Sequence, residues 1–168
     1  MRGLTLTQPW ATLMAIGAKR IETRSWSTKY RGLLAIHAAK SWPRDCQKQV
    51  FEWPFSEVLI KYFKGKAYEP NFWTALAMQL LPRGEIVATA NLINCVATGC
   101  AEIPALIHPP AGSANEYEFY FGDYSHGRCA WILSDVRALK SPIPCQGALG
   151  LWNVPADIAA RVKEESLK

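Results

Sequence analysis

The fold is decided by the stretch Gln8-Pro9-Trp10-Ala11-Thr12-Leu13-Met14-Ala15-Ile16-Gly17-Ala18-Lys19-Arg20-Ile21-Glu22-Thr23-Arg24-Ser25-Trp26. Its first half predicts a short helix, because the apolar or small residues fall at i, i+3, i+4 and i+7 on one face. These four positions are Trp10, Leu13, Met14 and Gly17. Glycine readily adopts the left-handed conformation that ends many helices, so we expect the helix to stop at Gly17.

The second half of the stretch predicts a strand that carries a dense set of charges. Alternation along it would place Lys19, Ile21 and Thr23 on one face and Glu22 and Arg24 on the other. A turn at the end of the helix could rotate Lys19 out of this register. The Glu22–Arg24 pair can serve as a functional cation and anion side by side, or as a structural ion pair worth about 0–1 kcal/mol if exposed.

Further strands are predicted where alternating or wholly apolar runs are bounded by turn residues. They cover Leu4–Leu6, Gly32–Ala38, Gly84–Ile93, Arg128–Val136 and Leu149–Val154. The run over 32–38 is nearly all apolar, which predicts a central strand covered on both faces. Its one histidine, His37, is expected to be a hydrogen-bonded core residue.

Helical patterns are concentrated in one internal segment, about residues 43–81, and at the end of the chain over 156–168. Prolines and a glycine divide the internal segment into two or three short helices, the last of them over 72–81. About 40 residues can barely stabilise a core of their own, so we expect an insertion that packs on the sheet. A Pro/Gly/Ser-rich loop is expected over Pro104–Asn115.

These elements predict a mostly β, α+β fold: one domain over residues 1–168, built as a small β-barrel with flanking helices and the helical insertion at about 43–81. The chain has 168 residues, of which 49% are hydrophobic and 20% charged, the balance of a globular protein. The formal net charge of +5 favours polyanionic partners such as nucleic acid. No apolar run reaches the roughly 20 residues of a membrane span, so no membrane partner is expected.

The five cysteines are scattered and form no C-x-x-C pair, which predicts free thiols in a reducing, cytoplasmic environment and no zinc site. His108 and His126 stand at no metal-ligand spacing. We therefore expect neither a metal site nor a cofactor.

The motif pattern resembles the ASCH family. It runs Q-P-W-A-x-L-x(3)-G-x-K-x-x-E-x-R-S-W from Gln8, followed by Y-R-G-L-L-x-I-H-A from Tyr30. A second block, F-G-D-Y-S-x-G-R-x-A-W-x-L from Phe121, and G-x-x-G-L-W from Gly147 extend the resemblance over Leu4–Ala39 and Arg83–Val154. The resemblance implies a PUA-like β-barrel with a polar cleft beside the first helix, and a link to RNA binding.

The same resemblance implies two possible activities. One branch of the family hydrolyses N4-acetylcytidine with a lysine, a threonine and a glutamate. The lysine matches Lys19, but the position of the threonine is taken by Glu22 here, with Thr23 adjacent. Glu102 and Glu118 are the candidates for the glutamate. Another branch has been described as a metal-dependent ribonuclease.

We predict that the cleft binds RNA or a modified nucleotide, with arginine and lysine on phosphate, aromatic rings on an unpaired base, and Glu22 or Gln8 on a base edge. The binding candidates are Gln8, Trp10, Lys19, Glu22, Arg24, Trp26, Arg31, Tyr124 and Arg128. If the chain is an amidohydrolase acting on N4-acetylcytidine, Lys19 and Glu22 are its catalytic candidates. Trp10 can equally be a core residue, since it shares its helical face with apolar neighbours.

A third alternative is a protein-interaction module that binds a partner through the helical insertion. Aromatic side chains recur there at Phe51, Trp53 and Phe55. If they form one contiguous exposed patch, that surface would fit a protein partner.

Overall fold

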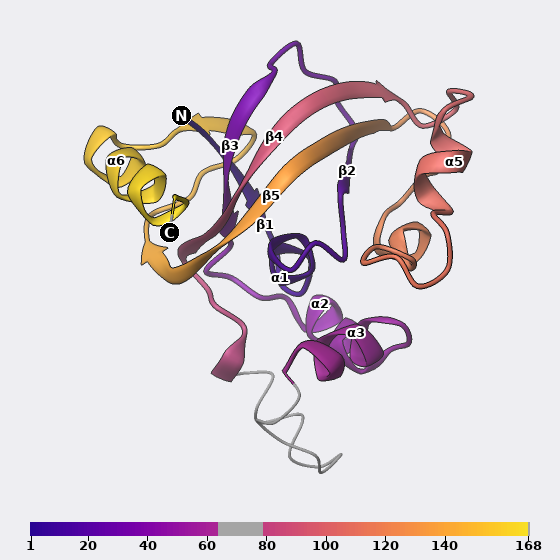
Figure 1. Cartoon of the computed structure of the whole chain (residues 1–168), viewed down its shortest axis with the longest axis horizontal. Helices are drawn as coiled ribbons and strands as arrows, with labels where there is room; N and C mark the ends of the chain where they lie inside the picture. Colours follow the sequence, from indigo (N-terminus) through magenta and orange to yellow (C-terminus); the bar gives the residue numbers. More distant parts are fainter. Residues whose placement is uncertain (64–78, 168) are drawn as a thin grey trace.

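One six-stranded sheet organises the chain, seen in a computed structural model that describes residues 1–63 and 79–167. Its strands are β1 (Arg2–Leu6), β2 (Ile21–Arg24), β3 (Gly32–Ala38), β4 (Glu85–Ala97), β5 (Cys129–Pro144) and β6 (Leu151–Asn153). They lie in the order β2-β5-β4-β3-β1-β6, and only β1 and β3 pair in parallel. The sheet curls into a half-barrel that arches over the first helix (Figure 1). This confirms the expected mostly β, α+β fold with a barrel-like sheet.

The curl of the sheet follows from its long, irregular central strands. The β4–β5 pairing shifts register at three places, and the β3–β4 pairing shifts between Ile36 and His37. Such bulges bend a strand and increase its twist. The predicted central position of β3 is confirmed, because β1 and β4 flank it and its last five residues are buried.

Helix α1 (Trp10–Ala15) packs its buried side against the curled sheet. Ala11 and Met14 share an apolar cluster with strand residues such as Leu34 and Leu133. The helix ends as predicted: Gly17 has φ +77°, and its N–H bonds to the carbonyl of Met14. Helix α6 (Ala156–Glu165) covers a separate cluster near the other end of the sheet.

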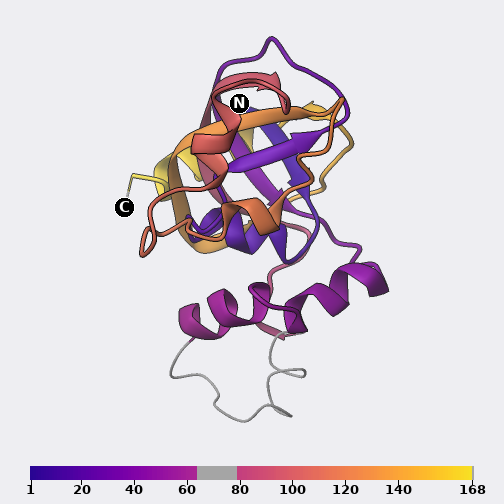
Figure 2. The same ribbon diagram turned by 90° about the vertical axis from the view of Figure 1, so that its right-hand side faces the viewer.

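The helical insertion forms a layer beside the sheet, as the turned view shows (Figure 2). Its described elements are α2 (Arg44–Lys48), the 3-10 turn η1 (Gln49–Phe51) and α3 (Phe55–Tyr62). Buried Val50, Phe55 and Leu59 share one cluster with Leu13 of α1. The described part of this segment therefore packs against α1. Most of the helix predicted over 72–81 lies outside the described residues.

Two sequence predictions were wrong in detail. The expected loop over 104–115 begins with a helix, α5 (Ile103–Ile107), because proline is tolerated in a first turn and the two isoleucines are buried against Ile21. The strand expected to end at 136 continues as β5 to Pro144. None of the helices within residues 1–63 and 79–167 has the length and apolarity needed to cross a bilayer.

Candidate nucleotide-binding cleft

A cleft of about 540 Å³ opens where β1, α1 and β2 meet the insertion and the 3-10 turn η2 (Glu118–Phe121). We name it the first cleft. Its main lining residues are Thr5, Thr7, Trp10, Glu22, Thr23, Arg24, Asp45, Gln49, Phe55, Tyr120, Phe121 and Asp123. Its volume is within the range of small-molecule sites, roughly 300–1,000 Å³.

Glu22 and Arg24 share one face of β2 and form a charged pair in this cleft. The Arg24 Nε lies 2.9 Å from the Glu22 Oε1, close enough for an ion pair but without the alignment of a hydrogen bond. A second guanidinium nitrogen of Arg24 donates to the carbonyl of Thr5, 2.9 Å away. The pair is held on two sides, so its charges keep fixed positions in the cleft.

Lys19 lies behind this pair, with 1% of its side chain exposed. Its ammonium donates to the carbonyls of Ile21 and Phe121, and it lies 3.8 Å from the Glu22 Oε2. Two of the three ammonium donors thus bond to backbone carbonyls, and the carboxylate of Glu22 lies at ion-pair distance. Lys19 is thus a buried cation beside Glu22, and it is buried as Ile21 and Thr23 are.

Glu118 is a fully buried carboxylate close enough to Lys19 to be influenced by its charge. Its two oxygens accept the backbone N–H groups of Arg20 (2.6 Å) and Ile21 (3.2 Å) and the hydroxyl of Tyr124 (3.2 Å). Burial raises the pKa of Glu118, and the nearby Lys19 charge and these hydrogen bonds oppose that rise. Burial, followed by the Glu118 charge, likewise raises the pKa of Tyr124.

Thr23 and Arg128 belong to a second polar group at the edge of the cleft. The Thr23 hydroxyl oxygen accepts the N–H of Asp123 (3.1 Å), and Arg128 donates to the Thr23 carbonyl (3.2 Å). The Arg128 Nε is 3.2 Å from the Asp123 carboxylate. Hydrogen bonds from Ser125 lower the pKa of Asp123. Arg128 therefore holds the loop at 122–125 against β2.

Comparison with known proteins shows the family to which the chain belongs. The model of the ASCH domain family matches residues 4–143. The chain belongs to the ASCH domain family. Activating signal cointegrator 1 of human is 34% identical to it over 169 aligned positions, and the mouse protein of the same name 25%. In both cases the match covers 98% of this chain but 24% of the relative's length.

The fold of this ASCH domain also occurs in solved structures. Two crystal structures of ZmASCH from Zymomonas mobilis, each of a different mutant protein, match with TM-scores of 0.51 and 0.52. Each match covers 97% of this chain and 96% or 94% of the other, at 14% sequence identity. This likeness supports the fold alone.

The residues predicted as binding candidates are only partly brought together in this ASCH domain. Trp10, Glu22 and Arg24 line the first cleft, and Trp10 packs edge-on against Phe55, with ring centroids 5.7 Å apart. Gln8 is fully buried. Its amide donates to the carbonyl of Pro82 and accepts the N–H of Thr12, so both its ends serve the fold.

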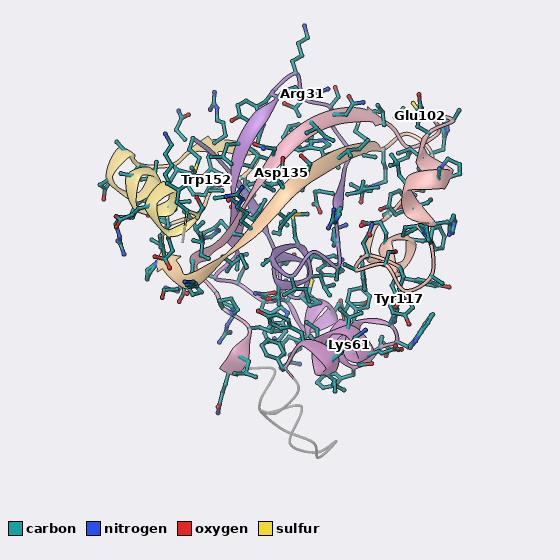
Figure 3. All side chains as sticks on the ribbon, viewed as in Figure 1. Arg31, Lys61, Glu102, Tyr117, Asp135 and Trp152 are labelled. Atoms are coloured by element: carbon teal, nitrogen blue, oxygen red, sulfur yellow. The ribbon has the colours of Figure 1, made fainter. Side chains whose placement is uncertain are left out.

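Trp26 and Arg31 line neither the first cleft nor the larger one that adjoins it. The ring of Trp26 packs edge-to-face against the ring of Trp131, with centroids 4.6 Å apart. Arg31 bonds to the carbonyls of Thr28 and Tyr30 and lies at the end of the molecule opposite α3, on which Lys61 is labelled (Figure 3). These two residues therefore line neither cleft, although they follow the 19–24 motif closely in sequence.

Several lining residues were missed by sequence reasoning. Thr5 and Thr7 flank the end of β1, while Asp45 and Gln49 come from the insertion and Tyr120 from η2. The two threonines stand next to the Gln-Pro-Trp motif, which could have signalled them. The other three have no local signal, because tertiary packing alone brings their segments to β2. Within the described ranges 1–63 and 79–167, no three His, Cys, Asp or Glu residues cluster as a metal site.

Proposed function

We propose that this ASCH domain binds an unpaired base of RNA, or a single nucleotide, in the first cleft. The observation that carries the proposal is the fixed Glu22–Arg24 pair at the polar side of a 540 Å³ cleft with aromatic walls. A carboxylate accepts the exocyclic and ring N–H groups of bases, and arginine donates to their carbonyls or to phosphate. Trp10 and Tyr120 offer ring faces or edges to the base.

The amidohydrolase alternative has weaker support from the geometry. Lys19 bonds to two backbone carbonyls, lies beside Glu22, and is not among the residues that line the cleft. Glu118 already accepts three hydrogen bonds. Thr23 does line the cleft, but its hydroxyl oxygen accepts a backbone N–H. These three side chains thus support the cleft wall, while Glu22 and Arg24 face the ligand.

A protein-interaction role has one specific observation in its favour. Trp53 and Phe51 are 56% and 46% exposed, and Trp53 contacts half-exposed Tyr120 with ring centroids 4.9 Å apart. Phe55 is buried, so the three aromatic residues of the insertion do not form a single exposed patch. The exposed rings border the first cleft through Tyr120, so the binding proposal can use them as well.

The test measures binding by intrinsic tryptophan fluorescence and calorimetry. The ligands are the four ribonucleosides, their monophosphates and single-stranded hexaribonucleotides. The variant Glu22→Gln keeps the shape of the side chain and removes its charge. We expect it to weaken binding of the preferred base about tenfold, the scale of one charge-assisted hydrogen bond.

The matched control is Glu102→Gln, which changes an exposed carboxylate outside the cleft. It should leave affinity within about twofold of the natural protein. If none of these ligands binds, or if Glu22→Gln and Glu102→Gln behave alike, the proposed function is wrong.

A further inference from the structure

A second cleft, of about 1120 Å³, adjoins the first. The two share Thr5, Thr7 and Arg24 as lining residues, so they are neighbouring parts of one groove. The second cleft runs over the ends of β3 and β5, between residues 39–41, 83–85 and 144–150. A ligand in the first cleft can therefore continue into the second past Arg24.

The two clefts differ in charge. The first contains three carboxylates, those of Glu22, Asp45 and Asp123, against the one guanidinium of Arg24. The second contains Lys40, Arg83 and Arg24 against the single carboxylate of Glu85.

The two cations that belong to the second cleft alone are available to a ligand. Lys40 and Arg83 are exposed, and no carboxylate of the described residues lies within 4.0 Å of either. The Arg83 guanidinium lies over the ring of Trp42, 5.8 Å from its centroid, which restricts where it can point.

The inner wall of the second cleft is packed and uncharged. His37 is buried there, and burial lowers its pKa, so it stays neutral near pH 7. Its Nε2 donates to the carbonyl of Cys145 at 2.9 Å. The backbone of Gly147 passes so close that an added Cβ would lie 2.4 Å from the His37 ring. The positive character of the cleft therefore comes from Lys40, Arg83 and Arg24.

We propose that the second cleft binds the phosphodiester backbone of the RNA strand whose base occupies the first cleft. Lys40 and Arg83 would bind the phosphates, and Arg24 would stand where base and backbone meet. This inference rests on the proposed function and makes it more specific: the ligand is a strand of at least two nucleotides and not a free nucleoside. Cations supply most of the affinity for a nucleic-acid backbone, and Lys40 and Arg83 lie apart from the carboxylates of the first cleft.

The test compares a nucleoside with a strand on the same protein. Affinities for the preferred ribonucleoside and for its hexaribonucleotide are measured at several salt concentrations. The variants are Lys40→Ala/Arg83→Ala and, because Arg83 packs on Trp42, Lys40→Gln alone. The matched control, Lys61→Ala/Lys163→Ala, removes two exposed lysines that line neither cleft. Thermal unfolding of each variant checks that it is folded.

We expect the natural protein to bind the hexamer at least tenfold more tightly than the nucleoside at about 0.1 M salt. Lys40→Ala/Arg83→Ala should weaken hexamer binding about tenfold and reduce the salt slope by up to about 1.4, or about 0.7 for each lost phosphate contact. Nucleoside binding should stay within twofold. Lys40→Gln should show about half of the slope change, and the control variant none.

Three results would overturn the inference. In the first, the hexamer binds no more tightly than the nucleoside; in the second, the double variant and its control lose affinity equally. In the third, the double variant weakens nucleoside binding as much as hexamer binding. In each of these cases the nucleoside still binds, so the proposed function stands. Failure of both ligands to bind the natural protein would instead refute the proposed function itself.

Discussion

Glu118→Ala tests whether the buried carboxylate holds the β2 motif in place. In the folded chain Glu118 accepts the N–H groups of Arg20 and Ile21 and the hydroxyl of Tyr124, and the nearby charge of Lys19 favours its ionised form. Alanine removes every one of these acceptors. The donors would be left in a site from which the fold excludes water, and Lys19 would lose a compensating charge.

The expected loss is large because several costs coincide. A buried donor without an acceptor costs about 1–3 kcal/mol, and three donors lose their acceptor when Glu118 becomes alanine. Water can enter the space left by the carboxylate and recover part of this cost. We therefore expect the free energy of unfolding to fall by about 3–5 kcal/mol, a substantial part of the roughly 5–15 kcal/mol typical of a domain.

The assay is urea unfolding followed by circular dichroism and tryptophan fluorescence. With a slope of about 2 kcal/mol per molar urea, the midpoint should fall by about 2 M. Glu102→Ala is the control: Glu102 was the other glutamate candidate, and it is exposed at the start of α5. Its midpoint should change by less than about 0.3 M, since a surface substitution costs within about 0.5 kcal/mol.

A Glu118→Ala midpoint within about 0.5 M of the Glu102→Ala midpoint, which corresponds to about 1 kcal/mol, would refute the reasoning. In that case the buried carboxylate would contribute nothing net to the fold, and the two carbonyls and Glu22 would hold Lys19 without it. A large loss restricted to Glu118 would confirm that this residue, and not Glu102, supports the motif.

Three further predictions concern the cleft walls. His37 is protonated at its ordinary pKa of 6.5 in the unfolded chain, whereas burial lowers its pKa in the folded chain. The free energy of unfolding should therefore be highest above pH 6.5 and fall as the pH drops below it. His37→Gln should reduce this fall in urea titrations between about pH 7.5 and 5.5, and an unchanged pH profile would contradict the prediction. Gly147→Ala should cost about 1–3 kcal/mol through its clash with His37, whereas Gly99→Ala, whose added Cβ has only ordinary contacts, should cost less than about 1 kcal/mol; equal costs would refute the close approach. Incubation with N4-acetylcytidine should release no cytidine by chromatography, and release that disappears in Thr23→Val would establish the hydrolase instead.

Local sequence predicted the strands, the first helix and the charged pair because each depends on short-range periodicity. Glu22 and Arg24 share a face of β2 since side chains alternate along a strand, as expected. The buried, hydrogen-bonded character of His37 also followed from its apolar run. Strand alternation alone does not fix the direction of Lys19, because a helix ends just before it, and the structure buries its side chain.

The sequence alone determined the ASCH family, the curled sheet and the motif that faces the cleft. Tertiary structure decided what surrounds that motif: Glu118 lies 97 residues along the chain from Ile21 and binds its N–H, and Asp45 and Tyr120 reach the cleft from separate segments. It also joined Lys40 and Arg83 across the end of the sheet into one basic cleft. The physical reason is the separation along the chain over which each effect acts. Periodicity specifies which way a side chain points within its own element. Burial and charge compensation depend on which distant segments pack against that element.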